Sequence, residues 1–300
     1  MARLFKYLGC SVLALVLLCL AAAALVLWKS NALLARSHAV AVGPVPASTG
    51  AEAIRRGEHI ARTRGCADCH GADFGGAKVI DDIAMGRIYG PNLTRGTGGL
   101  PSGFGDEDYV RAIRHGIGPG GRALFLMPAA EYAHFTDDDL GAVIAFLKAL
   151  PPVNRASPSI APGPVARLLL ATGRMRLAAD EIDHAGLRPS TVRPGATADY
   201  GRYLAAACMG CHGANFSGGR IAVGPPGWPA AANLTPEPGG PLAAWTEAEF
   251  IATLRSGRRP DGSALDPVMP RTFGQMDNVE LEAIWLFLKT LPPAPTGVRR

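Results

Sequence analysis

Apolar residues recur at helical intervals in several parts of the chain. In the segments 136–150 and 277–291 they stand three or four positions apart: Leu140, Ile144 and Leu147 in the first, and Leu281, Trp285 and Leu288 in the second. Such spacing is typical of a helix that buries one face. A double proline follows each segment and would end the helix there. We therefore predict a closing helix in each segment.

Four further segments favour helices, and they also form two similar pairs: 51–64 with 197–207, and 106–115 with 246–256. In the last of these, Thr246 and Glu249 have the spacing of a capping box. The stretches between the helices are rich in glycine and proline and show little of the alternation expected of strands. The predicted fold class is therefore all-α, with long loops. Such loops are uncommon in a small helical domain unless a large group inside the domain organises them.

The longest apolar run, residues 8–28, contains 21 residues and no charge. As a helix rising about 1.5 Å per residue it would extend over roughly 31 Å, which matches a hydrocarbon core of about 30 Å. The apolar stretch of a cleaved signal peptide is shorter, about 7–15 residues, although the alanines at 21–24 leave a cleavage site open as the alternative. Trp28 suits a membrane interface. We predict an uncleaved transmembrane helix within residues 1–45.

The rest of the chain contains an internal repeat, with a first copy at 46–155, a second at 196–300 and a linker at 156–195. Matching residues lie 141 or 142 positions apart: Cys66 and Cys208, Asn92 and Asn233, Arg114 and Arg255, Met127 and Met269, Phe146 and Phe287. A period this long indicates two duplicated domains, because solenoid repeats run about 20–50 residues. Each copy has an ordinary domain size.

Charge is distributed unevenly along the chain, which has 30 basic and 25 acidic residues. Residues 1–50 carry four basic residues and no acidic one, and the linker has a net charge of +2, whereas both repeats are close to neutral. A nucleic-acid-binding protein would concentrate basic residues on a folded face, so we exclude that class. With 48% hydrophobic residues the chain is too apolar to be disordered, and its single long apolar run excludes a multi-span membrane protein.

Every cysteine beyond the apolar run belongs to one of two C-x-x-C-H motifs: Cys66, Cys69 and His70, and Cys208, Cys211 and His212. This pattern signals covalent attachment of a c-type haem. Two cysteines three positions apart lie on the same side of a helical turn and can form thioethers with both vinyl groups of one porphyrin edge, while the histidine supplies an axial nitrogen to iron. A redox dithiol, a disulfide or a four-cysteine zinc site would need no histidine. The sequence therefore predicts two covalently bound haem c groups.

The methionines predict the second axial ligand of each iron. Only Met127 and Met269 recur between the repeats, each before a proline and 57 residues after the histidine of its motif, whereas Met276 matches Phe135. Proline disfavours a helical conformation at the residue before it, so the thioether would be presented from an extended loop. The alternative is that both methionines fill the core. Histidine–methionine ligation raises the reduction potential and occupies both axial sites, which favours electron transfer over catalysis.

Two further features favour structural roles. His59, His115 and His134 have no histidine at the matching position of the second repeat, so we predict that they are surface or satisfied histidines. The Asn-Leu-Thr triplets that begin at Asn92 and Asn233 match a glycosylation acceptor. Because the triplet recurs at one place in both repeats, a structural loop is the better interpretation.

The linker combines apolar side chains with basic ones: Val165, Leu168, Leu169 and Leu170 with Arg167, Arg174 and Arg176. Two interpretations are open. The apolar residues could pack on a domain while the arginines face a partner protein or lipid headgroups. Alternatively, the segment could be a helix that bridges the two domains.

The chain resembles the cytochrome c subunits of periplasmic membrane-bound dehydrogenases, such as those for alcohols, aldehydes and gluconate. The residues that carry the resemblance are clearest in the second repeat: 201–204, 208–212, 233–235, 245–255, 269–270 and 287–289. The resemblance implies two class I cytochrome c domains, with Cys66, Cys69, Cys208 and Cys211 as haem attachments and His70, Met127, His212 and Met269 as iron ligands. Those subunits usually carry three haem domains, whereas this chain has two.

These observations predict an electron-transfer protein rather than an enzyme, held by one span in the inner membrane with both haem domains in the periplasm. It would accept electrons from a periplasmic dehydrogenase and pass them to another cytochrome, an oxidase or a quinone. Two alternatives stay open. A dihaem peroxidase would need an axial site that can open, which the equal histidine-to-methionine spacings argue against. A cytochrome c subunit of a terminal oxidase would co-purify with a large multi-span partner.

Overall fold

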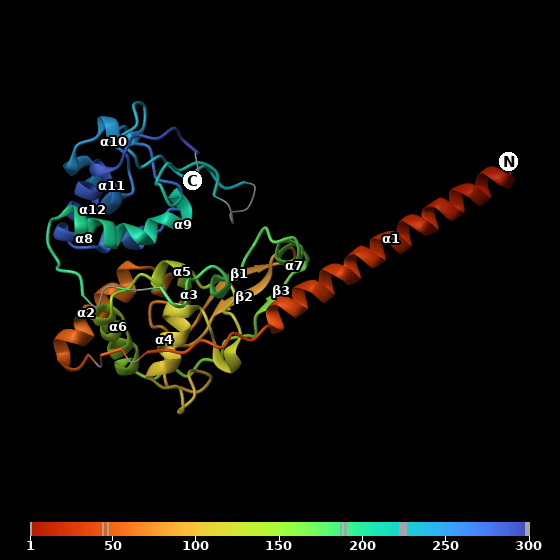
Figure 1. Ribbon diagram of the computed structural model, residues 1–300, viewed down its shortest axis with the longest axis horizontal. Coiled ribbons are helices and arrows are strands. Elements are labelled where there is room, and N and C mark those ends of the chain that lie inside the picture. Colours follow the sequence, from red (N-terminus) through yellow and green to blue (C-terminus); the bar gives the residue numbers. More distant parts are fainter. Residues whose placement is uncertain are drawn as a thin grey trace.

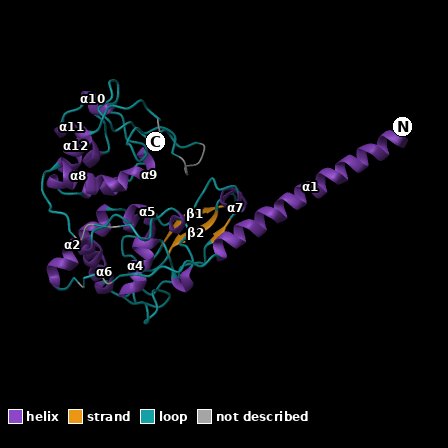
Figure 2. Ribbon diagram, in the orientation of Figure 1, coloured by secondary structure: helices purple, strands orange, loops and turns teal. Residues whose placement is uncertain are grey.

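The computed structural model describes residues 2–43, 45–46, 48–186, 188, 191–221 and 227–297. It contains two small helical domains and a long helix, α1, that projects away from the first of them (Figure 1). We call the helices from α2 to α6 domain 1 and the helices from α8 to α12 domain 2. The fold is predominantly helical, as the sequence predicted, and the strands lie together in one place beside domain 1 (Figure 2).

Domain 1 is built on the crossing of its first and last helices, α2 (Gly50–Thr63) and α6 (Asp137–Ala149). Gly57 lies at the crossing, where a β-carbon would stand 1.9 Å from the carbonyl oxygen of Ala142. The two backbones can approach this closely only because residue 57 has no side chain. Three shorter helices complete the domain: α3 (Cys66–His70), α4 (Asp106–His115) and α5 (Ala129–Tyr132).

Domain 2 repeats this crossing with α8 (Ala198–Ala205) and α12 (Asn278–Thr290). A β-carbon on Gly201 would stand 1.8 Å from the carbonyl oxygen of Ala283. Its other helices are α9 (Met209–His212), α10 (Pro241–Ala244) and α11 (Glu247–Ser256). At the start of α11 the Thr246 hydroxyl accepts a hydrogen bond from the Glu249 amide, while the Glu249 carboxylate accepts one from the Thr246 amide. The predicted capping box is therefore confirmed.

A three-stranded antiparallel sheet lies beside domain 1, and the sequence did not indicate it. Its strands are β1 (Ala77–Asp82), β2 (Gly86–Gly90) and β3 (Ala161–Pro162), in the order β1-β2-β3. Two of the strands could not show an alternating pattern, since β2 begins and ends in glycine and β3 has two residues. The pairing of β1 with β2 also shifts in register between Lys78 and Ile80, which interrupts the alternation further.

Helix α1 (Ala2–Ala35) is one continuous helix of 34 residues that includes the whole apolar run. Within the described residues it is the one helix long and apolar enough to cross a membrane. Almost all of its side chains before Ser30 are exposed, whereas Ser30 is fully buried. From that residue onward α1 packs against the rest of the protein.

The linker forms a short helix, α7 (Pro164–Ala171), which packs against the end of α1. A separate apolar cluster joins them, formed by the buried Ala166, Leu170, Met175 and Leu177 together with Leu33 and Leu34 of α1. Leu169 is partly buried, whereas Val165 and Leu168 are exposed. The linker therefore packs on the side of domain 1, and the alternative of a helix that bridges the two domains is wrong.

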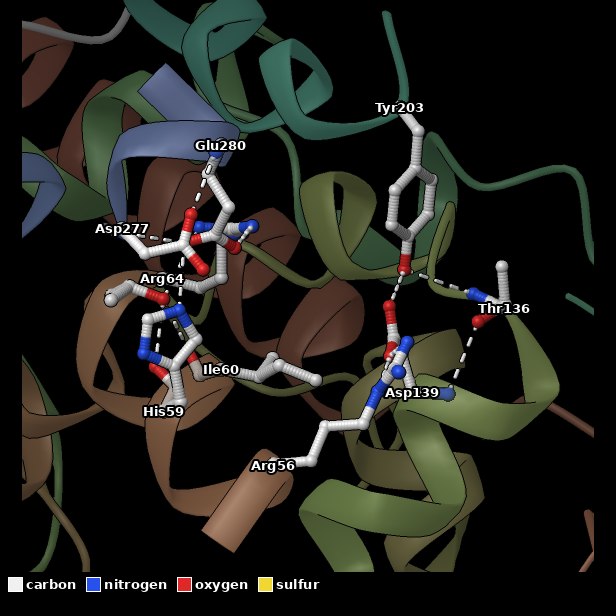
Figure 3. A network of polar contacts seen from close by, with 10 residues as sticks. Arg56, His59, Ile60, Arg64, Thr136, Asp139, Tyr203, Asp277 and Glu280 are labelled. Carbon is white, nitrogen blue, oxygen red and sulfur yellow. Dashed lines mark hydrogen bonds and ion pairs between the residues drawn. The ribbon is translucent and has the colours of Figure 1, made fainter. Parts of the chain in front are cut away.

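Figure 3 shows two of the places where polar side chains join domain 1 to domain 2. At the first, His59 Nε2 lies 2.7 Å from a carboxylate oxygen of Glu280, and the Arg64 guanidinium donates to the other oxygen over 3.3 Å. At the second, the Tyr203 hydroxyl donates to the Asp139 carboxylate over 2.6 Å. Arg56 also pairs with that carboxylate.

The two places are equivalent under the internal repeat. Gly57 and Gly201 occupy the same position in their helix crossings, so His59 corresponds to Tyr203, and Asp139 corresponds to Glu280 at the repeat offset of 141. Each domain therefore offers its first helix to the last helix of the other. This is the reciprocal contact of a two-fold symmetric dimer, formed here within one chain.

Candidate haem sites

In domain 1 the predicted site residues surround one cavity. Cys66, Cys69, His70 and Met127 all line it, and it encloses about 1370 Å³, a volume that counts its open mouth. Most of the other lining residues are apolar or aromatic, among them Ile88, Leu93, Leu100, Ile113, Phe135 and Leu147. The cavity is thus a hollow with the size and the apolar walls that a large planar prosthetic group needs.

Domain 2 has the equivalent cavity, of about 1150 Å³ on the same measure, lined by Cys208, Cys211, His212 and Met269. Met276 lines it as well and is 1% exposed. Its counterpart Phe135 lines the first cavity, so Met276 occupies the place of an aromatic core residue. The structure therefore brings together all four predicted residues in each domain, and Met269 keeps the position that matches Met127.

The histidine of each motif is held by a backbone carbonyl. His70 Nδ1 donates to the carbonyl of Pro91 over 2.8 Å, and His212 Nδ1 donates to that of Ala232 over 2.7 Å. Since a carbonyl can only accept, the proton lies on Nδ1 and Nε2 carries the lone pair. Burial lowers the pKa of both imidazoles, with the carbonyl acting against it. Both rings are therefore neutral and have the tautomer that an iron ligand requires.

A buried asparagine fixes the loop that carries the first of these carbonyls. Asn92 follows Pro91, and its Nδ2 donates to the carbonyls of Val153 over 2.7 Å and Arg155 over 3.0 Å. Its Oδ1 accepts from the backbone amide and from the hydroxyl of Thr94, at 2.9 and 2.8 Å. The side chain of Asn92 thus ties the loop to the chain beyond α6.

The second domain uses the same device. Asn233 follows Ala232, and its Nδ2 donates to the carbonyl of Ala294 over 2.7 Å. Its Oδ1 accepts from the amide and the hydroxyl of Thr235. The prediction of a structural loop is confirmed in both repeats. The sequence did not reveal the two carbonyls that hold the histidines, although the recurring triplet begins directly after each of them.

The comparison with known families decides what these cavities hold. The model of the cytochrome c family matches residues 54–151 and 198–292. This chain belongs to the cytochrome c family. The two matches, one on each cavity-bearing domain, indicate two covalently bound haem c groups, and a dihaem relative supports the same number. The cytochrome is an electron-transfer protein, as predicted.

Its relatives among curated proteins include subunits of dehydrogenase complexes. It is 29% identical over 276 residues to the gluconate 2-dehydrogenase cytochrome c subunit of Pantoea cypripedii, which covers 79% of this chain and 59% of that subunit. It is 27% identical over 271 residues to the fructose dehydrogenase cytochrome subunit of Gluconobacter japonicus, covering 83% and 54%. The cytochrome therefore spans a little over half the length of these subunits.

A shorter relative matches more of its own length. The dihaem cytochrome c-type protein of Cereibacter sphaeroides is 28% identical over 267 residues, which cover 79% of this chain and 85% of that protein. This relative shares the two-haem arrangement that the two motifs predict.

The cysteines of the cytochrome are poorly suited to the other functions considered for a C-x-x-C pair. Burial raises the pKa of Cys66 and of Cys208 to about 12, so neither is a reactive thiolate at neutral pH. All six cysteines lie in the described part of the chain, and none forms a disulfide. The two motifs also line different cavities, which excludes one four-cysteine zinc site.

The remaining histidines named in the sequence have structural surroundings. His59 pairs with Glu280 at the domain contact. His115 is buried with Nδ1 3.0 Å from that of His184, and burial lowers its pKa to about 4, reinforced by His184. His134 is exposed. Neither cavity has any of them in its lining, so the prediction of surface or satisfied histidines is confirmed.

Proposed function

We propose that this cytochrome is anchored in the inner membrane and transfers electrons from a periplasmic dehydrogenase to the respiratory chain. In domain 1, Cys66 and Cys69 would attach the haem, with His70 and Met127 as the axial ligands. In domain 2 the corresponding residues are Cys208, Cys211, His212 and Met269. The observation that carries the proposal is that these eight residues line two apolar cavities, four residues in each.

Each group of residues has a distinct task in this proposal. The haem supplies a one-electron couple when it is bound. The neutral histidine, fixed by its carbonyl, offers Nε2, and the methionine offers a thioether that raises the potential. The apolar walls exclude water and so favour the less charged, reduced state of the centre. If the histidine and the methionine both hold the iron, no position on it would be left for a substrate, which supports a carrier over a peroxidase.

Contacts between the domains support electron transfer from one centre to the other. Asp68, inside the first C-x-x-C, accepts a hydrogen bond from the Thr272 hydroxyl over 3.2 Å, and Thr272 lies three residues after Met269. Conversely, Glu131 lies four residues after Met127, and its carboxylate is so close to Gly210 in the second C-x-x-C that a β-carbon there would stand 2.1 Å from it. The C-x-x-C turn of each domain thus contacts the segment that follows the methionine ligand proposed for the other domain.

The membrane anchor rests on α1. Its apolar stretch is as long as a bilayer core is thick, and in the described part of the protein almost all of its side chains over that length are exposed. We expect the mature protein to keep this helix and to resist extraction from membranes by alkaline carbonate. A mature N-terminus beyond residue 24, together with release into the soluble periplasmic fraction, would show instead that the segment is a cleaved leader.

The dehydrogenase partner is proposed from the relatives that are subunits of such complexes. The test is to purify the tagged full-length cytochrome from native membranes under mild conditions. We expect a dehydrogenase to co-purify and its substrate to reduce both haems. Co-purification of a multi-span oxidase without a dehydrogenase would favour the oxidase subunit, and a high-spin iron with rapid peroxide turnover would favour the peroxidase.

Haem content provides an independent check. Acid–acetone extraction should leave two haems per chain, and the double variant Cys208→Ser, Cys211→Ser should retain one. As a control, Cys10→Ser with Cys19→Ser should retain two, since both cysteines lie in the apolar run of α1. A ratio of one in the unmodified protein would overturn the assignment.

A further inference from the structure

Helix α7 lies where α1 leaves its apolar stretch. The Arg167 guanidinium donates to the Ser30 hydroxyl over 3.1 Å and to the side-chain oxygen of Asn31 over 2.7 Å. The apolar run ends at Trp28, so at about 1.5 Å per residue these contacts lie only about 3–5 Å beyond it. Figure 1 shows α7 beside this end of α1. The level of α7 along α1 is therefore the level of a membrane surface, if α1 spans the membrane.

This position is fixed by packing rather than by a flexible connection. Ser30 is fully buried, and Leu33 and Leu34 pack against the buried Ala166 and Leu170 of α7. The end of α1 and the inner face of α7 thus form one apolar cluster. A membrane that α1 spans must therefore lie close to the outer face of α7.

The outer face of α7 is apolar although none of the residues that the structure describes covers it. Val165 and Leu168, three positions apart, are 41% and 47% exposed. Beside them the turn between β1 and β2 carries Ile83, which is 94% exposed, and the Val165 amide donates to the carbonyl of Ala84 in that turn over 2.9 Å. Ile83, Val165 and Leu168, which we call the contact face, thus unite two segments far apart in the sequence.

Basic residues accompany the contact face on the side of α7. Residues 156–177 contain three arginines and no acidic residue, and Arg174 and Arg176 are exposed just beyond the helix. Arg176 also lies 3.9 Å from the carboxylate of Glu181, and both of these side chains keep about half or more of their surface exposed. Lys29 follows the apolar run on α1 and is exposed as well. Asp81 and Asp82 precede Ile83, so the positive charge lies in and just beyond α7 and not in the β-turn. Apolar side chains beside arginines are the combination that binds the boundary of an anionic bilayer.

We propose that the contact face inserts into the headgroup region of the bilayer that α1 spans, with Arg174 and Arg176 facing anionic lipid. The proposal rests on the membrane anchoring proposed above. Its occupant is the lipid surface, because the face is continuous with α1 at the level where the apolar run ends. Two attachments, one spanning and one lying on the surface, would hold domain 1 in a single orientation toward the membrane.

The test uses the full-length protein with both haems, in nanodiscs of anionic phospholipid. In a background of Cys10→Ala and Cys19→Ala, a single cysteine is introduced by Leu168→Cys and labelled with a fluorescent dye. The emission is compared between discs with brominated and ordinary acyl chains, so that quenching by the haems cancels in the ratio. The matched control is Val279→Cys, on α12 of domain 2, where the native side chain is 42% exposed.

We expect bromine to quench the label at 168 several-fold and the label at 279 hardly at all. A third label, at Leu17→Cys within α1, separates this inference from the anchor. If the label at 17 is quenched and that at 168 is not, the contact face is not in the lipid, while the anchor stands. If neither is quenched, both proposals are overturned. Protection of the label at 168 from a water-soluble quencher only in the native complex would assign the face to a protein partner instead.

The charge component has its own measurement. Arg174→Glu with Arg176→Glu should reduce the quenching of the label at 168 in anionic discs at least two-fold, and higher salt should act in the same direction. Two exposed arginines of domain 2 serve as the control, Arg202→Glu with Arg258→Glu, and should leave it unchanged. Equal quenching in both double variants would overturn the assignment of these arginines to lipid headgroups.

Discussion

The two contacts that join each C-x-x-C turn to the other domain occupy equivalent positions but use different chemistry. Where domain 2 brings the neutral hydroxyl of Thr272 to Asp68, domain 1 brings the carboxyl of Glu131 to the backbone of Gly210. Burial raises the pKa of Glu131 to about 7. One of the two contacts therefore has a carboxyl group that is about half ionised at neutral pH. The duplication has kept the geometry of the contact and not its charges.

The interiors of the two domains differ much less. Both keep the glycine at the helix crossing, the asparagine that ties the loop, the carbonyl that holds the histidine and the methionine before a proline. The residues around the two cavities are therefore shared, whereas the residues on the surfaces where the domains meet have changed. The comparison teaches that the prosthetic group constrains the inside of each domain, and that assembly has determined the outside separately.

The largest effect is expected from the methionines, because they are shared. Met127→His and Met269→His should each lower the potential of one haem, since loss of the thioether destabilises ferrous iron. We expect a drop on the order of 0.1 V or more, within the roughly 0.8 V that axial ligands cover. Redox titration measures the potentials, and each variant should lose part of the methionine–iron charge-transfer band of the oxidised protein.

Two other methionines test whether this assignment is right. Met276→Leu is the demanding control, because Met276 lines the second cavity as Met269 does, and Met85→Leu is the distant one. Neither should alter the charge-transfer band. If Met276→Leu removes the band of one haem while Met269→His leaves it intact, Met276 is the ligand and the equivalence of the two domains ends at that position.

The helix crossings should respond equally in both domains. Gly57→Ala and Gly201→Ala each place a β-carbon less than 2 Å from a backbone carbonyl oxygen, so the helices must move apart. We expect each to destabilise its own domain by about 3 kcal/mol. Hydrogen exchange followed by mass spectrometry resolves the two domains. Gly103→Ala is the control, because nothing lies within 4 Å of the added β-carbon. A similar loss of stability in that variant would show that the close approach of the helices is not the cause.

The asparagines should give a smaller and similarly paired effect. Asn92→Ala and Asn233→Ala each take the asparagine partner away from at least one part-buried backbone carbonyl and from a fully buried threonine, at a cost of about 2 kcal/mol. The same hydrogen-exchange experiment should locate the loss in the tied loop. Asn154→Ala removes a single bond, to the exposed amide of Thr97, and should cost much less. If Asn92→Ala costs no more than Asn154→Ala, the buried tie contributes nothing to stability.

The smallest effect concerns pH, and it should distinguish the two contacts of Figure 3, His59 with Glu280 and Tyr203 with Asp139. The hydrogen bond to Glu280 raises the pKa of His59 above 6.5. The contribution of protonated His59 to stability is therefore complete below pH 6.5 and is lost as the pH rises through the raised pKa. Burial alone would raise the pKa of Glu280, but the bond from His59 and the charge of Arg64 outweigh it and lower the pKa. The pair is therefore strongest between the lowered and the raised pKa.

Because the His59 side chain is 37% exposed, we expect less than about 1 kcal/mol from this pair. As the pH rises from mildly acidic to mildly alkaline, the loss of this pair should lower the thermal midpoint slightly, and His59→Gln should remove that contribution to the slope. Tyr203→Phe, at the equivalent position, should lower the midpoint without changing the slope, because burial and Asp139 keep that hydroxyl protonated far above neutral pH. Equal slopes in His59→Gln and the unmodified protein would contradict the assignment.

Much of the fold was predictable because it depends on local pattern. The six helices predicted in the two repeats begin and end within about two residues of the predicted segments, since caps such as Thr246 and the double prolines act on their neighbours in sequence. The sheet and the packing of α7 on α1 were not predictable. Both depend on segments far apart in the chain, and the two residues of β3 carry no pattern of their own.

The site shows the same division. The side chains around each cavity could be named from the sequence because attachment and ligation require particular residue types at a fixed spacing. The carbonyls of Pro91 and Ala232 could not, since any residue supplies a carbonyl. The domain contact was also missed, because His59 and Tyr203 become equivalent only when the helix crossings are superimposed.

The buried asparagines have a consequence for producing this protein. Asn92 and Asn233 begin acceptor triplets for N-linked sugar, yet they are only 1% and 4% exposed, and their Nδ2 atoms already donate to backbone carbonyls. A sugar attached at either nitrogen during synthesis would occupy the atom that closes the loop. A eukaryotic secretory host would therefore modify the chain before it folds and trap it unfolded, whereas a host without that transferase would leave both loops free to close.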